Sequence, residues 1–303
     1  MNVSVQTTVN VRPIDPARPD FAGEITGIDI AAGVAKAEAM AIEAAMDRYG
    51  VLVFRDQRIN DAQQYAFSEN FGPMETATGD LGMAKDRRLS MDINDISNLD
   101  KDGKILARDS RRRLFSLGNR LWHSDSSFKA TPSKYSLLSA RVIPGAGGNT
   151  EFADMRAAWD ALDEATRNEC LDLVCDHSQI YSRGMLGFNL DDFSDEDQQR
   201  LSPVPQRLVR RHAATGRLSL YLASHAGTIH GWPVPEARAF LRDLVEHATQ
   251  PPFVYAHAWQ TFDLVMWDNR ATMHRARPFD ASQVRDMRRT TVADSAPTLQ
   301  QAR

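Results

Sequence analysis

Residues 121–128, with the sequence LWHSDSSF, place a histidine and an aspartate two positions apart. Side chains at positions i and i+2 of a β-strand point to the same face. If this segment is a strand, His123 and Asp125 present an imidazole nitrogen and a carboxylate oxygen to one metal ion. The alternative is a polar strand edge with a Ser-Asp turn, because a histidine this close to an aspartate is common by chance.

A metal site needs a further ligand from a distant part of the chain, and His274 is the best candidate. It follows an apolar, strand-like segment and a turn-like WDNR sequence at 267–270. Two histidines and one carboxylate leave three positions of an octahedron open, as in the facial triad of non-haem Fe(II) oxygenases. Zinc more often takes three or four protein ligands, commonly with cysteine, and these segments contain no cysteine.

The open metal positions would suit a 2-oxo acid and dioxygen. The distal carboxylate of 2-oxoglutarate would need a cation, and arginine binds carboxylates through two hydrogen bonds. On a strand over 285–292, Arg285 and Arg289 face the same way and lie about 13 Å apart. Such a pair would hold two anions, the co-substrate and an anionic substrate. The alternative is a surface strand with exposed arginines.

The pattern of elements predicts a mainly β fold with flanking helices. One helix is expected over 34–50, where it ends at Gly50, and another over 60–73, where it ends at a Gly-Pro pair. One amphipathic helix is expected over 154–174, and a helix that begins with a proline over 235–250. Short strands are expected at 21–30, 51–57, 134–144, 145–155, 208–224 (a hairpin), 253–259, 263–269 and 287–294. This arrangement favours a β-sandwich or jelly roll over a doubly wound α/β sheet.

Composition narrows the classes of function. The 303 residues carry a formal net charge of −4, so we expect no nucleic-acid partner. The basic run Arg111-Arg112-Arg113 is interpreted as a solvated loop. Cys170 and Cys175 lie in a segment expected to be helical, which predicts no disulfide. Without a signal peptide or a stretch of about 20 apolar residues, we expect no membrane partner and a cytoplasmic location.

Residues 74–120 differ from the rest of the chain. They are polar and rich in arginine, lysine and aspartate, with one strand-like patch at 94–100. Loops of this length inside a compact domain are commonly active-site lids or partly disordered. We therefore expect a lid-like insertion that would exclude water from a reaction site.

Ordered sequence blocks with a common pattern run along nearly the whole chain. They read GVLVFRDQ, LWHSDSSF, YSLLSARVIP, GGNTEFADMRAAWDAL, DLVMWDNRATMHR and RDMRRTT. Together they resemble the taurine dioxygenase superfamily of Fe(II)/2-oxoglutarate-dependent dioxygenases, and most of all its members that act on 2,4-dichlorophenoxyacetate. The resemblance implies one domain over 1–303 with a double-stranded β-helix (jelly roll) core. It also implies Fe(II), 2-oxoglutarate and O2 as cofactor and co-substrates.

The resemblance implies roles at the metal and the co-substrate. His123, Asp125 and His274 match the iron ligands of the superfamily. Thr150 matches a threonine whose hydroxyl binds a co-substrate carboxylate. Arg285 matches the arginine that pairs with the distal carboxylate of 2-oxoglutarate.

Further positions match substrate-binding residues of the superfamily. Arg289 matches the arginine that holds the anionic group of the substrate, and Asn119 matches a pocket asparagine of the taurine enzymes. Lys104, His212 and His225 fall where the phenoxyacetate enzymes have residues implicated in substrate binding.

The reaction implied by the resemblance is hydroxylation of the carbon next to the ether oxygen of an aryloxyalkanoate such as 2,4-dichlorophenoxyacetate. The products would be a phenol and glyoxylate, with succinate and CO2. We expect a small anionic substrate and a homo-oligomer. Two alternatives stay open: a taurine or alkylsulfonate dioxygenase that releases sulfite, and a non-catalytic, cupin-like metal-binding protein.

Overall fold

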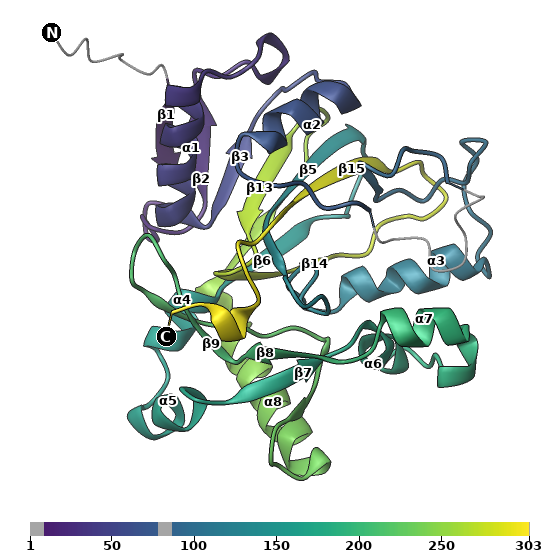
Figure 1. Cartoon of the computed structure of the whole chain (residues 1–303). Helices are drawn as coiled ribbons and strands as arrows, with labels where there is room; N and C mark the ends of the chain where they lie inside the picture. The colour runs from purple at the N-terminus through teal and green to yellow at the C-terminus, as the bar shows by residue number, and fades with distance from the viewer. Residues whose placement is uncertain (1–8, 78–86, 303) are drawn as a thin grey trace, which may run out of the picture.

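A large, mostly antiparallel sheet forms the centre of the computed structural model, which describes residues 9–77 and 87–302 (Figure 1). Among the described residues, seven strands make this sheet, and only β2 and β3 pair in parallel. In spatial order they are β1 (Asn10–Pro13), β2 (Gly23–Thr26), β3 (Val51–Phe54), β13 (Leu264–Asp268), β5 (Ser133–Val142), β15 (Asp286–Ala293) and β4 (Asn94–Asp95).

A second sheet packs against one face of the large sheet. It consists of β12 (Val254–His257), β6 (Thr150–Asp154) and β14 (Thr272–Ala276), with β6 in the middle. Phe152 of β6 belongs to one buried apolar cluster with Val265 of β13. The space between the two sheets is therefore part of the core.

Two helices cover the opposite face of the large sheet, namely α1 (Lys36–Tyr49) and α2 (Asp61–Glu69) (Figure 1). Alternate residues of β3 show the two faces: Leu52 and Phe54 pack with α1 and α2, whereas Val51 and Val53 belong to the cluster between the sheets. Both helices confirm the predictions from sequence, with an asparagine cap before α2 and Gly50 after α1.

The remaining elements surround the second sheet and the site. They are α3 (Arg111–Ser116), α4 (Met155–Asp160), α5 (Glu164–Cys170), β7 (Val174–His177), α6 (Gln179–Gly184), α7 (Asp195–Arg200), β8 (Val204–Arg207), β9 (Val209–Arg211), β10 (Leu218–Leu220), β11 (Ala226–Ile229) and α8 (Val234–Ala248). The predicted hairpin is present as β9 and β10. No helix among the described residues is long and apolar enough to cross a bilayer.

The prediction of one helix over 154–174 was wrong. The chain forms α4 and then α5, because Asp163 caps a new helix by accepting a hydrogen bond from the N–H of Thr166 at 2.9 Å. Cys170 ends α5, whereas Cys175 lies in strand β7. Both cysteines are buried free thiols, so the expected lack of a disulfide between them is confirmed.

The interpretation of the basic run as a solvated loop was also wrong. Residues 111–116 form α3, and the side chain of Ser110 caps it by accepting from the N–H of Arg113 at 3.3 Å. Arg112 points inward and pairs with Asp95 at 2.8 Å, with side chains 17% and 8% exposed. The carboxylate that holds this arginine comes from strand β4, and the spacing of the two residues in the sequence does not reveal this contact.

Candidate active site

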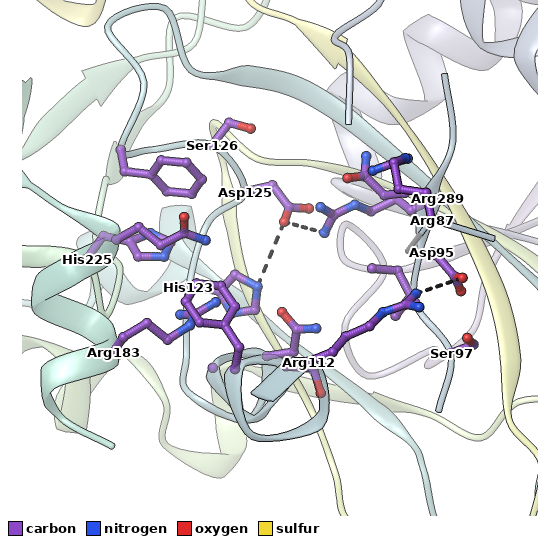
Figure 2. A pocket seen from close by; sticks show the side chains of 18 residues that line it. Arg87, Asp95, Ser97, Arg112, His123, Asp125, Ser126, Arg183, His225 and Arg289 are labelled. Carbon is purple, nitrogen blue, oxygen red and sulfur yellow. Dashed lines mark hydrogen bonds and ion pairs between the residues drawn. The ribbon is translucent and has the colours of Figure 1, made fainter. Parts of the chain in front are cut away.

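Three buried side chains from distant segments meet beside β14. His123, Asp125 and His274 each offer one ligand atom, and these atoms all lie within 4.8 Å of one another. Nε2 of His123 lies 3.8 Å from one carboxylate oxygen of Asp125 (Figure 2). Nε2 of His274 lies 3.7 Å from the other carboxylate oxygen. These gaps are too long for hydrogen bonds, but an ion with ligand distances of about 2 Å can bridge them. The cluster therefore fits a metal ion.

His123 and Asp125 do not share a strand, so that prediction was wrong. His123 forms an isolated β-bridge in which its backbone exchanges hydrogen bonds of 3.0 and 2.8 Å with His274. The chain then turns, and Ser126 adopts a φ of 52°. The bridge places the two imidazole rings 4.2 Å apart, and the turn positions the aspartate beside them.

Asp125 is held by three side chains. Ser136 donates to one carboxylate oxygen at 2.7 Å, and Arg289 donates to the other at 2.5 Å. Asn269 accepts from the backbone N–H of Asp125 and donates to the hydroxyl of Ser136, both at 3.0 Å. Burial alone would raise the pKa of Asp125, but the charge of Arg289 and the hydrogen bond from Ser136 hold that pKa well below its usual range. The carboxylate is therefore ionised, as a metal ligand must be.

The two imidazoles are also fixed in orientation. Nδ1 of His123 lies 2.7 Å from the carbonyl oxygen of Leu121, which leaves Nε2 for the metal position. The ring of Trp267 packs against that of His274, with the ring centroids 4.7 Å apart. Burial lowers the pKa of both histidines, so each is neutral, the form that binds a metal.

A small cavity beside His274 contains Thr150 and Arg285. Thr150 Oγ1 accepts a hydrogen bond from Trp259 Nε1 at 3.0 Å, which leaves the hydroxyl hydrogen free to be donated. Arg285 is 6% exposed, and burial lowers the pKa of its guanidinium to about 10. It donates to the carbonyl oxygen of Ile96 at 3.3 Å, and no carboxylate among the described residues pairs with it. This cavity therefore suits an anion.

A larger cavity also has His123 in its wall (Figure 2). Its wall includes Asn119, Phe128 and His225, and the ring of Phe128 meets that of His225 edge to face at 4.9 Å. The two cavities share Ile96, Asn119, His123 and Arg289. They are therefore adjoining compartments, with His123 in the wall of both.

Comparison with known proteins agrees with this geometry. A family model described as "Taurine catabolism dioxygenase TauD, TfdA family" matches residues 10–291. The chain belongs to this family. Membership of the TauD, TfdA family makes the protein a dioxygenase, so the cupin-like, non-catalytic alternative is disfavoured.

Individual relatives cover almost the whole chain. The alpha-ketoglutarate-dependent 2,4-dichlorophenoxyacetate dioxygenase of Cupriavidus pinatubonensis is 44% identical over 282 residues, 93% of this chain and 98% of that protein. The crystal structure of AAD-2 in complex with Mn(II) and N-oxalylglycine matches with a TM-score of 0.91 and 57% identity, over 96% of this chain and 99% of the other. A taurine dioxygenase from Burkholderia xenovorans has a TM-score of 0.75 and 27% identity, over 96% and 91%.

The substrate residues suggested by the TauD, TfdA family pattern do not all meet. Asn119, His225 and Arg289 line the larger cavity. Lys104 is exposed and lines neither cavity. His212 is buried elsewhere, with Nε2 at 3.2 Å from Asp268, and also lines neither. The structure therefore does not bring Lys104 or His212 to the site.

Several residues of the site were not identified from the sequence. Asn269 and Ser136 orient Asp125, Trp259 orients Thr150, and Arg183 of α6 lines the larger cavity. The turn-like WDNR sequence contained Asn269, but nothing in its spacing linked that asparagine to Asp125. Such contacts arise only when β5, β13 and the turn at 125–128 are assembled.

Proposed function

We propose that the protein is an Fe(II)- and 2-oxoglutarate-dependent dioxygenase that hydroxylates the carbon next to the ether oxygen of an aryloxyalkanoate such as 2,4-dichlorophenoxyacetate. One oxygen atom of O2 enters the substrate and the other enters succinate, with release of CO2. The hydroxylated product is a hemiacetal, which breaks down to a phenol and glyoxylate. The observation that carries the proposal is the buried cluster of His123, Asp125 and His274 beside two adjoining cavities, of which the smaller suits an anion.

Different residues would bind the metal, the co-substrate and the substrate. His123, Asp125 and His274 would hold Fe(II), which when bound supplies the chemistry of O2 activation. Thr150 would donate its hydroxyl hydrogen to one carboxylate of 2-oxoglutarate, and Arg285 would pair with the distal one. The larger cavity would hold the substrate with its reactive carbon facing the metal.

The phenoxyacetate substrate is favoured over a sulfonate by similarity. The relative named for 2,4-dichlorophenoxyacetate is 44% identical to this chain, whereas the taurine dioxygenase is 27% identical. Aromatic side chains in the larger cavity, Phe115 and Phe128, also suit an aryl ring better than the short chain of taurine. Release of sulfite from taurine, with no phenol from 2,4-dichlorophenoxyacetate, would favour the sulfonate alternative instead.

The architecture belongs to the same proposal. The two facing sheets support a double-stranded β-helix (jelly roll) core within one domain over 1–303. In the predicted insertion at 74–120, the described residues 87–120 contribute several side chains to the cavity wall, which supports a role in excluding water. Residues 78–86 of the insertion lie outside the described residues. The homo-oligomer and the cytoplasmic location remain predictions.

The proposed function is tested by replacing each of the three cluster residues separately. His123→Ala, Asp125→Ala and His274→Ala should each abolish formation of succinate and of 2,4-dichlorophenol from 2,4-dichlorophenoxyacetate, because two remaining ligands hold the metal poorly. Circular dichroism of each variant controls for folding. Full activity in any one folded variant would remove that residue from the proposed metal site.

A further inference from the structure

A third cavity, which we call the basic cavity, adjoins the smaller of the two cavities at the metal cluster. Its volume is about 400 Å³, which is ample for a five-carbon dianion. It shares Ala276 and Arg285 with the smaller cavity, and neither residue lines the larger cavity. The charged residues of its wall are one aspartate and five arginines: Asp95, Arg108, Arg113, Arg120, Arg277 and Arg285. The basic cavity therefore leads directly to the arginine expected to pair with 2-oxoglutarate.

Most of the positive charge in the basic cavity is uncompensated. Asp95 is already paired with Arg88 at 2.9 Å, and with Arg112 at 2.8 Å (Figure 2). Arg277 lies 3.5 Å from Glu151. The other four arginines have no carboxylate partner in the part of the chain that the structure describes: Arg108, Arg113, Arg120 and Arg285. A cavity lined by charges of one sign focuses their field, which attracts ions of the opposite sign and speeds their association.

The arginines of the basic cavity extend from the surface to the buried site. Arg108 and Arg120 are exposed, whereas Arg285 is buried. The guanidinium carbon of Arg285 lies 5.5 Å from the ring centroid of Phe279, which also lines this cavity. Coulomb attraction scales with the charge of the ligand, so 2-oxoglutarate, with two carboxylates, is drawn in more strongly than a monocarboxylate. The basic cavity is thus better suited to the co-substrate than to an aryloxyalkanoate.

The larger cavity offers the co-substrate a poorer route to Arg285. It shares His123 and Arg289 with the smaller cavity, so a molecule that moves from the larger to the smaller cavity must pass the metal cluster. A substrate bound in the larger cavity would close this route. Neither His123 nor Arg289 lines the basic cavity. A ligand that enters through the basic cavity therefore reaches Arg285 without crossing the substrate position.

We propose that 2-oxoglutarate enters, and succinate leaves, through the basic cavity, while the substrate uses the larger cavity with its carboxylate at Arg289. Arg108 and Arg120 would attract the dianion at the surface, and Arg285 would bind it inside. The inference rests on the proposed function only as far as the co-substrate is concerned. It follows that the co-substrate can exchange while the substrate cavity is occupied.

The first test measures how fast 2-oxoglutarate associates with the Mn(II)-loaded protein without O2, by stopped-flow tryptophan fluorescence. Trp259, bonded to Thr150, and Trp267, in the wall of the smaller cavity, are placed to report binding. The double variant Arg108→Glu/Arg120→Glu should lower the association rate constant about 10-fold at low salt, because two attracting charges are reversed. The dissociation rate constant should stay near the wild-type value, since neither arginine holds the bound co-substrate. High salt should shrink the difference, because it screens exposed charges.

Two matched variants control for net charge and for side-chain shape. Arg58→Glu/Arg242→Glu reverses two arginines whose side chains are 68% and 66% exposed and which line none of the three cavities. Arg108→Lys/Arg120→Lys changes the side chains in the basic cavity but keeps both charges. Both controls should associate with 2-oxoglutarate at nearly the wild-type rate. An equal slowing in Arg58→Glu/Arg242→Glu would show that net charge alone sets the rate, which would overturn the inference.

The second test fills the larger cavity before 2-oxoglutarate is added. The Mn(II)-loaded protein is saturated with 2,4-dichlorophenoxyacetate, as checked by calorimetric titration, and the same association rate is measured. The rate constant should change little, because the basic cavity stays open. A rate that falls in proportion to the occupied fraction of the protein would show that the co-substrate enters through the larger cavity, and the inference would be wrong.

Equilibrium titration of the wild type separates failure of the inference from failure of the proposed function. If the Mn(II)-loaded wild type binds no 2-oxoglutarate, the proposed co-substrate is wrong and the inference falls with it. If the wild type binds 2-oxoglutarate, and Arg108→Glu/Arg120→Glu associates with it equally fast at low salt, only the inference falls. Rejection of 2,4-dichlorophenoxyacetate as a substrate would leave the first test intact, because that test contains no aryloxyalkanoate.

Discussion

At the scale of single residues, Asn269 connects the parts of the candidate metal site. Its Oδ1 accepts from the backbone N–H of Asp125 and from Nε1 of Trp267, both at 3.0 Å. Its amide nitrogen donates to Ser136, whose hydroxyl donates to the carboxylate of Asp125. The side-chain oxygen of Asn269 thus accepts two hydrogen bonds while its nitrogen donates one. Because these bonds form together, this residue fixes the orientation of the aspartate.

Asn269→Ala should weaken metal binding by about 10- to 100-fold, because the ligand loses its orienting partners. The measurement is an anaerobic titration with Fe(II) or Mn(II). The control is Gln64→Ala in α2, which removes another fully buried amide. The amide nitrogen of Gln64 donates to the carbonyl oxygen of Leu137 at 3.1 Å. Both variants should lose stability, but only Asn269→Ala should lose affinity; equal affinities would contradict the assigned role.

At the scale of elements, the end of α1 is joined to α4 and to the large sheet. Gly50 ends α1 with a φ of 66°, and its carbonyl oxygen accepts from the N–H of Asp268 at 2.9 Å. Arg156 of α4 donates to the carbonyl oxygens of Asp47 and Arg48 at 3.2 and 2.9 Å. These carbonyl groups have no partner within the helix, so the arginine satisfies the end of α1.

Gly50→Ala should lower the free energy of unfolding by more than the roughly 1 kcal/mol expected for a left-handed backbone alone. The excess arises because the new Cβ would lie 3.1 Å from Nη2 of Arg156. Gly216→Ala is the control, since Gly216 has a φ of 70° with nothing within 4 Å of its added Cβ. Urea unfolding compares the two; equal losses would show that crowding against Arg156 adds nothing.

At the scale of the whole molecule, buried ion pairs join the insertion to the large sheet. Arg88 lies 2.9 Å from Asp95 of β4 and 2.7 Å from Asp286 of β15. Arg112 of α3 pairs with the same Asp95. The segment that lines the larger cavity is thus bonded to the strand that carries Arg289. Ligands bound between them should therefore stabilise the fold as one unit.

Mn(II) with N-oxalylglycine, stand-ins for Fe(II) and 2-oxoglutarate, should raise the Tm. At about 100 times the Kd, binding to the folded state alone adds about 2.7 kcal/mol. Differential scanning fluorimetry measures the shift, and a chelator should reverse it. Asp125→Ala is the control, because it lacks the carboxylate ligand. The same shift in this variant would place the ligands somewhere other than the proposed site.

Local sequence determined a large part of the fold. The helices before Gly50 and after Asn60, the hairpin at 208–224 and the strands at 51–57, 134–144 and 263–269 follow from capping residues, turns and apolar patterns, which act between neighbours. The same local signals failed at 154–174, where the single predicted helix is broken in two. They also missed α3, because a run of arginines predicts solvation as readily as a helix.

For the site, the sequence by itself determined the residue types and the family pattern that unites His123, Asp125 and His274. The tertiary structure decided how they meet, through a β-bridge and a turn instead of a common strand. It also decided that Arg289 is paired, and that Lys104 and His212 lie elsewhere. The reason is physical: burial and charge pairing depend on segments far apart in the chain, whereas periodicity and capping depend only on neighbours.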